Sequence, residues 1–341
     1  MCDHCATTLE VWQGQPAPQL YGFTAAEVAA ALVRVAAGGT YRSVAGSIRT
    51  QAGRKLSTAR PPKTPRGRVA VAPNNHAQIV SDWVDVFAPV LWAHYVPKEW
   101  PEYVILDDKE FQFRPIRRVA GVRPSSRRAF VVLAAMGYIK GQPKVVAVEA
   151  SRTRTRAAWR TFLRHTPGVP TRVVGDGGEP LEGAREVWQA LPNPPLLVRC
   201  QWHLGKNLRD KLPRDIVEGP TYPDRETGEI PDPIKGLVTR AFYSPKDWQA
   251  LVDEVHKRQP TERRLSGLRK QVDDFDTWIP GHLRQIHGTR GPTANGPVET
   301  FVNDLAGILG DRAHGFTNKK RTDAVLLLLA MQHNGWVDQV Q

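Results

Sequence analysis

The order of apolar segments between residues 102 and 199 most constrains how this chain folds. Three strand-like segments come first, at 103–114, 128–139 and 144–150. A helix, a strand, a helix and a strand are then predicted, at 155–164, 171–175, 180–191 and 196–199. Successive strands are typical of a meander, and strands that alternate with helices are typical of parallel β–α–β units. The chain is therefore expected to be an α/β protein with a mixed sheet.

Two of the apolar runs in these predicted strands end in an aspartate, and both aspartates are interpreted as acids at the carboxyl ends of buried strands. Asp107 follows the run 103–106, and Asp176 follows the run 172–175. A third acid, Glu299, begins a helical pattern just after a glycine and a proline. Two strand-end carboxylates and one helix carboxylate can form an oxygen-ligand cage for paired divalent cations. We therefore predict that Asp107, Asp176 and Glu299 bind two Mg²⁺ or Mn²⁺ ions.

The first of these acids has a neighbour, Asp108, which is the alternative ligand. Side chains alternate between the two faces of a strand, so only one of the two aspartates points inward. Asp107 is preferred because Phe111 and Phe113 share its parity. Asp108 is then expected on the exposed side.

The charge of the chain favours a polyanionic partner. Its 341 residues include 47 Lys and Arg against 34 Asp and Glu, which gives a formal charge of +13. No run approaches the roughly 18 apolar residues of a membrane span, and the first residues lack the pattern of a signal peptide. The three cysteines fit a reducing compartment rather than a disulfide framework. We expect a cytoplasmic protein that acts without a membrane.

Residues 1–60 are predicted to form an N-terminal helical module. A helix at 25–37, a glycine pair and a second helix that Thr40 caps give the order helix, turn, helix. This order resembles a helix-turn-helix whose second helix enters a major groove, with Arg42 and Arg49 available to DNA. A helical hairpin within a bundle gives the same pattern.

The first residues contain half of a zinc ribbon. Cys2 and Cys5 have the Cys-x-x-Cys spacing, yet a structural zinc site needs four ligands, and no second pair lies nearby. Bound zinc is not expected there, and a truncated or decayed ribbon is the preferred interpretation.

The remaining organisation follows from composition. Residues 61–100 are predicted to hold a basic linker and a helix. The linker, 57–73, is rich in Pro, Lys and Arg, and lies along a phosphate backbone or serves as a solvated tether. The helix, 76–95, carries an apolar stripe for the core. Residues 101–341 are predicted to form the catalytic domain, with a helical insertion at about 205–285.

Four separated motifs carry a resemblance to a known family. They are residues 106–111 (LDDKEF), 174–177 (VGDG), 200–207 (CQWHLGKN) and 293–299 (TANGPVE). With these motifs the chain resembles the DDE transposases of bacterial Mutator-like insertion sequences over roughly residues 100 to 335. The resemblance implies a ribonuclease-H-like catalytic domain. It also implies that Asp107, Asp176 and Glu299 hold two metal ions, and that Cys200, His203 and Asn207 lie beside the active site.

One departure from the family concerns the glutamate. The family commonly has Thr-Asn two residues before it, whereas here Asn295 precedes Glu299 by four positions. This loosens the assignment of Glu299, and Asp304 is a poor substitute.

These residues also have purely structural interpretations. An aspartate after a strand often forms a turn, and a glutamate at a helix start complements the helix dipole. Cys200 and His203 can be a small buried side chain beside a core histidine. Trp202 can stack on an unpaired base or pack against the core strand.

Basic residues around the predicted first hairpin and the following helix are expected to contact DNA phosphates. They are Arg123, Arg127, Arg128, Arg152, Arg154 and Arg156, and Lys206 joins them from the Cys-x-x-His motif.

The resemblance implies strand cleavage and strand transfer on double-stranded DNA, at transposon ends and target. Two DNA ends must be joined, so a homodimer or higher oligomer is expected. An inactive, domesticated DNA-binding regulator and a nuclease on the same fold are the alternatives.

Overall fold

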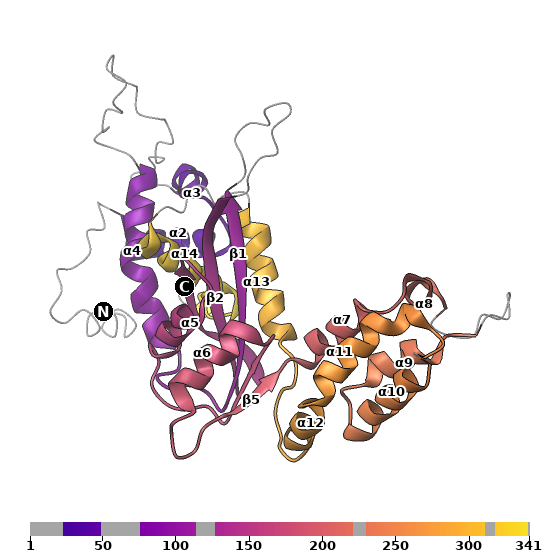
Figure 1. The fold of residues 1–341 in the computed structure, drawn as a ribbon. Coiled ribbons are helices and arrows are strands. Elements are labelled where there is room, and N and C mark those ends of the chain that lie inside the picture. The colour runs from indigo at the N-terminus through magenta and orange to yellow at the C-terminus, as the bar shows by residue number, and fades with distance from the viewer. Residues whose placement is uncertain are drawn as a thin grey trace. The chain divides into compact units, whose positions relative to one another are not determined.

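The computed structural model describes residues 23–48, 76–113, 127–220, 230–258, 260–310 and 318–339. These pack into two compact units (Figure 1). Of the described residues, unit 1 takes in those within 1–100, 108–154 and 297–341, and unit 2 takes in those within 101–107 and 155–296. The predictions on Cys2, Cys5, the linker at 57–73, Arg49 and Arg123 lie outside the described residues. So do the side chains of Arg127 and Arg128.

Among the described residues, five strands form a sheet with the order β3-β2-β1-β4-β5. Its strands are β1 (Tyr103–Phe113), β2 (Arg127–Ile139), β3 (Gln142–Ser151), β4 (Arg172–Gly175) and β5 (Leu196–Arg199). The pair β2 and β3 is antiparallel, whereas β4 is parallel to both β1 and β5. The prediction of a mixed α/β sheet is confirmed, because every predicted strand corresponds to an observed one.

The helices of unit 1 form a packed group. They are α2 (Ala25–Ala36), α3 (Tyr41–Ser47), α4 (His76–Tyr95), α13 (Gly296–Leu309) and α14 (Lys319–His333). Thr24 and Thr40 cap α2 and α3 as N-cap residues, and both helices pack against α4. The apolar stripe expected on this helix was Ile79, Trp83, Val86, Phe87, Val90 and Leu91. Of these only Trp83 is buried, and the other buried residues of α4 are Val80, Ser81, Val84 and Ala88. The predicted helical hairpin thus exists and packs within a bundle.

Helix α14 covers the outer edge of the sheet. Asn334 donates to and accepts from the backbone of Val145 in β3, with distances of 2.9 and 2.8 Å. Asp323 accepts a hydrogen bond from the Ala150 N–H at 2.7 Å. The backbone groups of an edge strand otherwise lack partners within the sheet, and here side chains of α14 supply some of them.

In unit 2, α5 (Arg156–Leu163) and α6 (Gly178–Trp188) pack against each other. Trp159 of α5 is fully buried and lies 5.5 Å from Phe162, ring centre to ring centre. A Cβ on Gly183 of α6 would lie 2.6 Å from the Trp159 Cβ, so glycine allows the two helices to approach closely.

Among the described residues of unit 2, six further α-helices form a cluster (Figure 1, pink to orange). They are α7 (Gln201–Arg209), α8 (Arg214–Glu218), α9 (Pro233–Arg240), α10 (Pro245–Arg258), α11 (Ser266–Asp276) and α12 (Ile279–His287). Their apolar faces share one core, which includes Leu204, Trp248 and Leu283. The Trp248 indole N–H in this core donates to Asp276 at 2.7 Å. The segment expected to be a helical insertion is helical.

The described helices include none with the length and apolar character that crossing a membrane requires.

Candidate active site

The two predicted aspartates belong to neighbouring parallel strands. Asp176 directly follows β4, whereas Asp107 lies within β1, so the prediction that Asp107 ends its strand is wrong: the strand continues past the apolar run to Phe113. In the ladder between β1 and β4, Tyr103 pairs with Arg172 and Ile105 pairs with Val174. Continued by two residues, this register places Asp107 opposite Asp176. Adjacent strands lie about 4.8 Å apart, so the backbones of these two residues lie side by side. Asp107 is half-buried and Asp176 is exposed.

Asp108 takes part in a different interaction. Its carboxylate lies 3.8 Å from the guanidinium of Arg154, which follows β3. Since neighbouring side chains of a strand point to opposite faces, Asp107 and Asp108 serve different surfaces. This arrangement favours Asp107 over Asp108 as the partner of Asp176.

The backbone turns sharply directly after Asp176. Gly177 has φ 105° and ψ −163°, a conformation that is essentially restricted to glycine. The Arg199 side chain lies against this turn, and its Nε donates to the Asp176 carbonyl oxygen at 3.3 Å. A Cβ on Gly177 would lie 2.7 Å from that Nε. The conformation of this turn therefore depends on the positive φ of Gly177 and on the contact with the Arg199 side chain.

Arg199 links this turn to the helical cluster. Its guanidinium carbon lies 5.9 Å from the ring centre of Phe275 and 5.7 Å from that of Trp278. Burial lowers the pKa of Arg199, and the charge of Asp176 opposes this shift. Sequence reasoning missed Arg199, since a single arginine at the end of a short strand carries no motif.

The cysteine of the Cys-x-x-His motif is buried and has a specific partner. Cys200 Sγ lies 3.1 Å from Asn295 Oδ1, and the Asn295 N–H donates to the sulfur at 3.4 Å. The Cys200 N–H donates to the Gly175 carbonyl at 2.7 Å, which fixes the start of α7 beside the residue before Asp176. Cys200 and Asn295 belong to two of the motifs found in the sequence, but the contact between them was not predicted.

Further bonds hold the segment before Asn295. The buried side chain of Arg172 donates to the carbonyl oxygens of Thr289, Gly291 and Pro292 at 3.0–3.1 Å. The Gln201 N–H donates to the Thr293 carbonyl at 2.9 Å. The segment 289–295 is therefore anchored to β4 and to the start of α7. Sequence reasoning missed the role of Arg172, because a buried arginine at a strand start looks like any other basic residue.

The third predicted acid belongs to unit 1. Glu299 lies in the first turn of α13 and is half-buried. One helical turn later, Asn303 accepts a hydrogen bond from Lys109 of β1 at 3.0 Å. Residues four apart share one face of a helix, so Glu299 and Asn303 lie on the same face of α13. Along the chain, Glu299 follows the anchored Asn295 by four residues.

The remaining motif residues lie on α7. His203 is half-buried, and its Nδ1 is buried with no hydrogen-bond partner among the residues that the structure describes. Asn207 lies one turn further on and is half-buried. Trp202 is 45% exposed, so it does not pack into the core. The Lys206 ammonium lies 5.6 Å from its ring centre.

The described basic residues proposed for DNA differ in their surroundings. Arg42, Arg152, Arg154, Arg156 and Lys206 are exposed. Arg154 pairs with Asp108, and the Arg156 Nε lies 2.9 Å from a carboxylate oxygen of Glu186.

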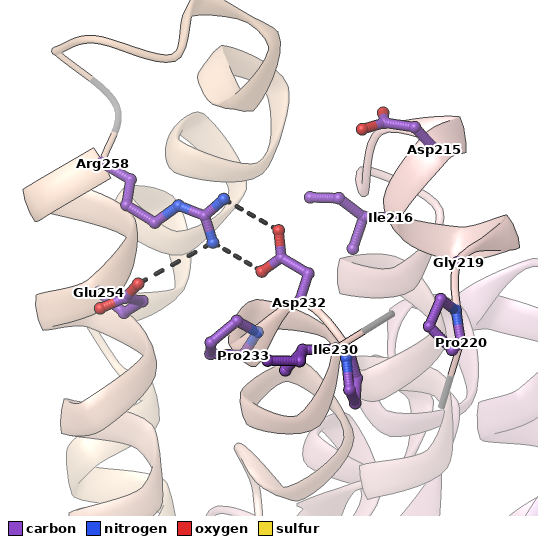
Figure 2. A pocket seen from close by; sticks show the side chains of 10 residues that line it. Asp215, Ile216, Gly219, Pro220, Ile230, Asp232, Pro233, Glu254 and Arg258 are labelled. Atoms are coloured by element: carbon purple, nitrogen blue, oxygen red, sulfur yellow. Dashed lines mark hydrogen bonds and ion pairs between the residues drawn. The ribbon is translucent and has the colours of Figure 1, made fainter. Parts of the chain in front are cut away.

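A second acidic region lies in the helical cluster, around a hollow of about 530 Å³ (Figure 2). Two nitrogens of Arg258 donate to the two carboxylate oxygens of Asp232, at 2.6 and 2.9 Å. Glu254 and Glu262 also pair with Arg258. The hydrogen bonds from Arg258 lower the pKa of the Asp232 carboxyl. This is a structural ion-pair network, because its acids already bind one guanidinium.

The chemistry of the pair Asp107 and Asp176 suits a hard divalent cation. Asp107 and Asp176 supply oxygen ligands of the kind that Mg²⁺ prefers, from neighbouring register positions. Within the described ranges, no three His, Cys, Asp or Glu side chains gather as a metal site. Asp107 and Asp176 therefore account for two of the three carboxylates that were expected to bind metal, and Glu299 is not grouped with them in the described part of the chain. The sequence of this chain matches no protein-family model, and it matches no curated protein.

Proposed function

We propose that this chain is a DDE transposase of the Mutator-like type that it resembles. It would cut DNA at the ends of a mobile element and join the freed 3′ ends to target DNA. The observation that carries the proposal is the register between β1 and β4, which, continued by two residues, brings Asp107 opposite Asp176. Two neighbouring carboxylates suit phosphoryl transfer assisted by divalent cations.

The sheet order supports the finer assignment of a ribonuclease-H-like fold. A central β1, an antiparallel β2–β3 pair on one side, and parallel β4 and β5 on the other fit that arrangement. Fold alone does not specify chemistry, so the acids and their surroundings bear the weight of the proposal.

In this proposal Asp107, Asp176 and Glu299 hold two Mg²⁺ or Mn²⁺ ions. When bound, these cations would lower the pKa of the attacking oxygen and neutralise charge on the leaving oxygen. Glu299 is proposed as the third ligand because the resemblance assigns it this role, and it lies in the first turn of α13. Arg199 is a positioning residue that fixes the turn carrying Asp176.

The DNA partner is proposed from charge. A net charge of +13 and the exposed Arg42, Arg152 and Lys206 suit a phosphate backbone, with affinity that falls as salt rises. The protein would act in the cytoplasm as a homodimer or larger assembly, since two ends must be joined in one event.

A strand-transfer assay tests the proposal. The purified full chain is incubated with Mg²⁺ or Mn²⁺, a supercoiled plasmid, and labelled duplexes from either side of its own coding sequence that end in a 3′-OH. Joined product supports a transposase. Cleavage without joining indicates a nuclease, and binding without either indicates a regulator.

Two variants locate the chemistry. Asp176→Asn should abolish cleavage and joining while DNA affinity remains near that of the unchanged chain. Asp108→Asn is the matched control, because its carboxylate faces Arg154. An Asp176→Asn variant that still cuts DNA would remove this residue from the site.

A further inference from the structure

The exposed indole of Trp202 is the feature that the proposed chemistry leaves unexplained. Most tryptophans of folded proteins are largely buried because the ring is large and mainly apolar. Among the described residues, Trp83, Trp159 and Trp248 follow this rule, with at most 1% exposure. Trp202 is 45% exposed, so its ring surface is available for binding.

The ring has a defined setting. The His203 imidazole lies edge-on to it, with ring centres 4.8 Å apart and planes at 88°. The Lys206 ammonium lies 5.6 Å from the ring centre, one helical turn along α7. Lys206 is itself exposed, and Arg209 follows in the last turn of the helix. An aromatic surface beside ammonium and guanidinium groups is the combination that binds a base together with its phosphate.

The position of the ring along the chain connects it with the acid pair. Trp202 lies in the first turn of α7, two residues after Cys200. The Cys200 N–H is bonded to Gly175, the residue before Asp176. The start of α7 and the end of β4 are therefore held together within unit 2.

We propose that Trp202 and Lys206 form a stacking platform for an unpaired nucleobase next to the cleaved phosphate. The inference rests on the proposed action on DNA and makes it more specific: the bound end would carry a base that has left the duplex. Trp202 supplies the stacking surface and Lys206 supplies a charge for the neighbouring phosphate. The positive surroundings favour a nucleic acid over an apolar protein partner.

Binding measurements without divalent cations test the platform apart from any chemistry. The probes are two short duplexes of the same sequence, one with an unpaired 2-aminopurine and one fully paired. The unchanged chain should bind the unpaired probe more tightly and quench its fluorescence by stacking. Trp202→Ala should weaken binding of the unpaired probe roughly 5- to 100-fold, which corresponds to the stacking energy of about one base. Its affinity for the paired probe should stay within about twofold.

Salt dependence separates the two residues. Lys206→Ala should lower the slope of log affinity against log salt by about 0.7 to 0.9, the loss of about one phosphate contact. Trp202→Ala should leave this slope unchanged, because stacking releases no counterions. Tyr243→Ala is the matched control, since Tyr243 is a 66% exposed aromatic residue elsewhere in unit 2. Thermal unfolding of each variant checks that the fold is intact.

Several results would overturn the platform. Equal affinity of the unchanged chain for both probes would remove it, and so would a Trp202→Ala variant that keeps the preference. If Trp202→Ala instead abolished self-association in light scattering while both affinities stayed constant, the ring would belong to a protein interface. A chain that stacks the unpaired base yet joins no ends keeps the platform and loses the transposase assignment.

Discussion

Asp176 and Asp232 both lie beside an arginine in unit 2, yet the two arginines bind them differently. Arg258 places two nitrogens on the carboxylate of Asp232 and binds further acids as well. Arg199 instead donates to the backbone carbonyl of Asp176. The first arrangement fixes a carboxylate in an ion pair, and the second fixes the backbone that carries one.

The difference bears on the roles proposed for the two acids. A carboxylate bound at both oxygens by a guanidinium has few positions left for a metal or substrate. Side-chain identity is the same at both positions, so the contacts of the neighbouring arginine distinguish them.

The largest effect is expected when each aspartate is replaced by asparagine, which exchanges one carboxylate oxygen for an amide nitrogen. Asp176→Asn should lower cleavage by about 10³-fold or more, because several kcal/mol of charge stabilisation are lost, while the urea midpoint stays near that of the unchanged chain. Asp232→Asn should do the reverse, with a lower midpoint and near-normal activity. If the two variants changed the cleavage rate and the urea midpoint to the same extent, the proposed difference between Asp176 and Asp232 would be contradicted.

Removing the arginine of the structural pair is the next largest change. Arg258→Ala leaves Asp232 and Glu254 without their partner, and should cost about 2–3 kcal/mol of unfolding free energy in urea titration. Arg214→Ala, which breaks an exposed pair with Glu218, is the control and should leave the midpoint unchanged.

The same variant should alter the pH dependence of stability. Because Arg258 holds the folded pKa of Asp232 below its usual value of 3.8, this contribution is complete above pH 3.8 and declines as the pH falls through the folded pKa. The difference in stability between the unchanged chain and Arg258→Ala should therefore shrink in acid. A difference that stayed constant down to the acid limit would contradict the ion pair.

Two neighbouring glycines test the turn beside Asp176. Gly177→Ala combines a forbidden backbone conformation with a contact at 2.7 Å to Arg199, and should cost about 1–3 kcal/mol and lower kcat. Gly178→Ala also has a positive φ, 55°, but no atom lies within 4 Å of its new Cβ. It should cost about 1 kcal/mol and leave kcat nearly unchanged. Similar kcat values for the two variants would show that contact with Arg199 does not position Asp176.

The smallest effect concerns Arg199 itself. Arg199→Lys keeps the charge but loses the planar group beside Phe275 and Trp278, at about 0.5–1 kcal/mol. A few-fold fall in kcat with an unchanged KM is expected, since the turn loosens but substrate contacts remain. Activity equal to that of the unchanged chain would limit Arg199 to packing.

Much of the sheet could be predicted from sequence because buried strands are short apolar runs with clear breaks. The apolar runs before Asp107 and Asp176 located β1 and β4, and the strand-end position was correct for Asp176 but wrong for Asp107, because β1 continues to Phe113. Their shared register followed only from the observed pairing of β1 with β4. Sequence order does not specify which strands are neighbours.

The supporting contacts could not be predicted, since each joins residues far apart along the chain. Arg172 reaches the carbonyls of 289–292, and Cys200 reaches Asn295. Trp202 had two open interpretations because local sequence does not determine exposure. Only the position of α7 against its neighbours leaves that ring in contact with water.

The cover that α14 gives to β3 limits how copies of this chain can associate. Asn334 and Asp323 occupy backbone groups that an incoming strand would use. Sheet-to-sheet extension through this margin is therefore blocked, which guards the protein against fibrous aggregation. A shortened chain that ends before residue 319 would lack α14 and expose the edge of β3. We expect such a chain to aggregate more readily.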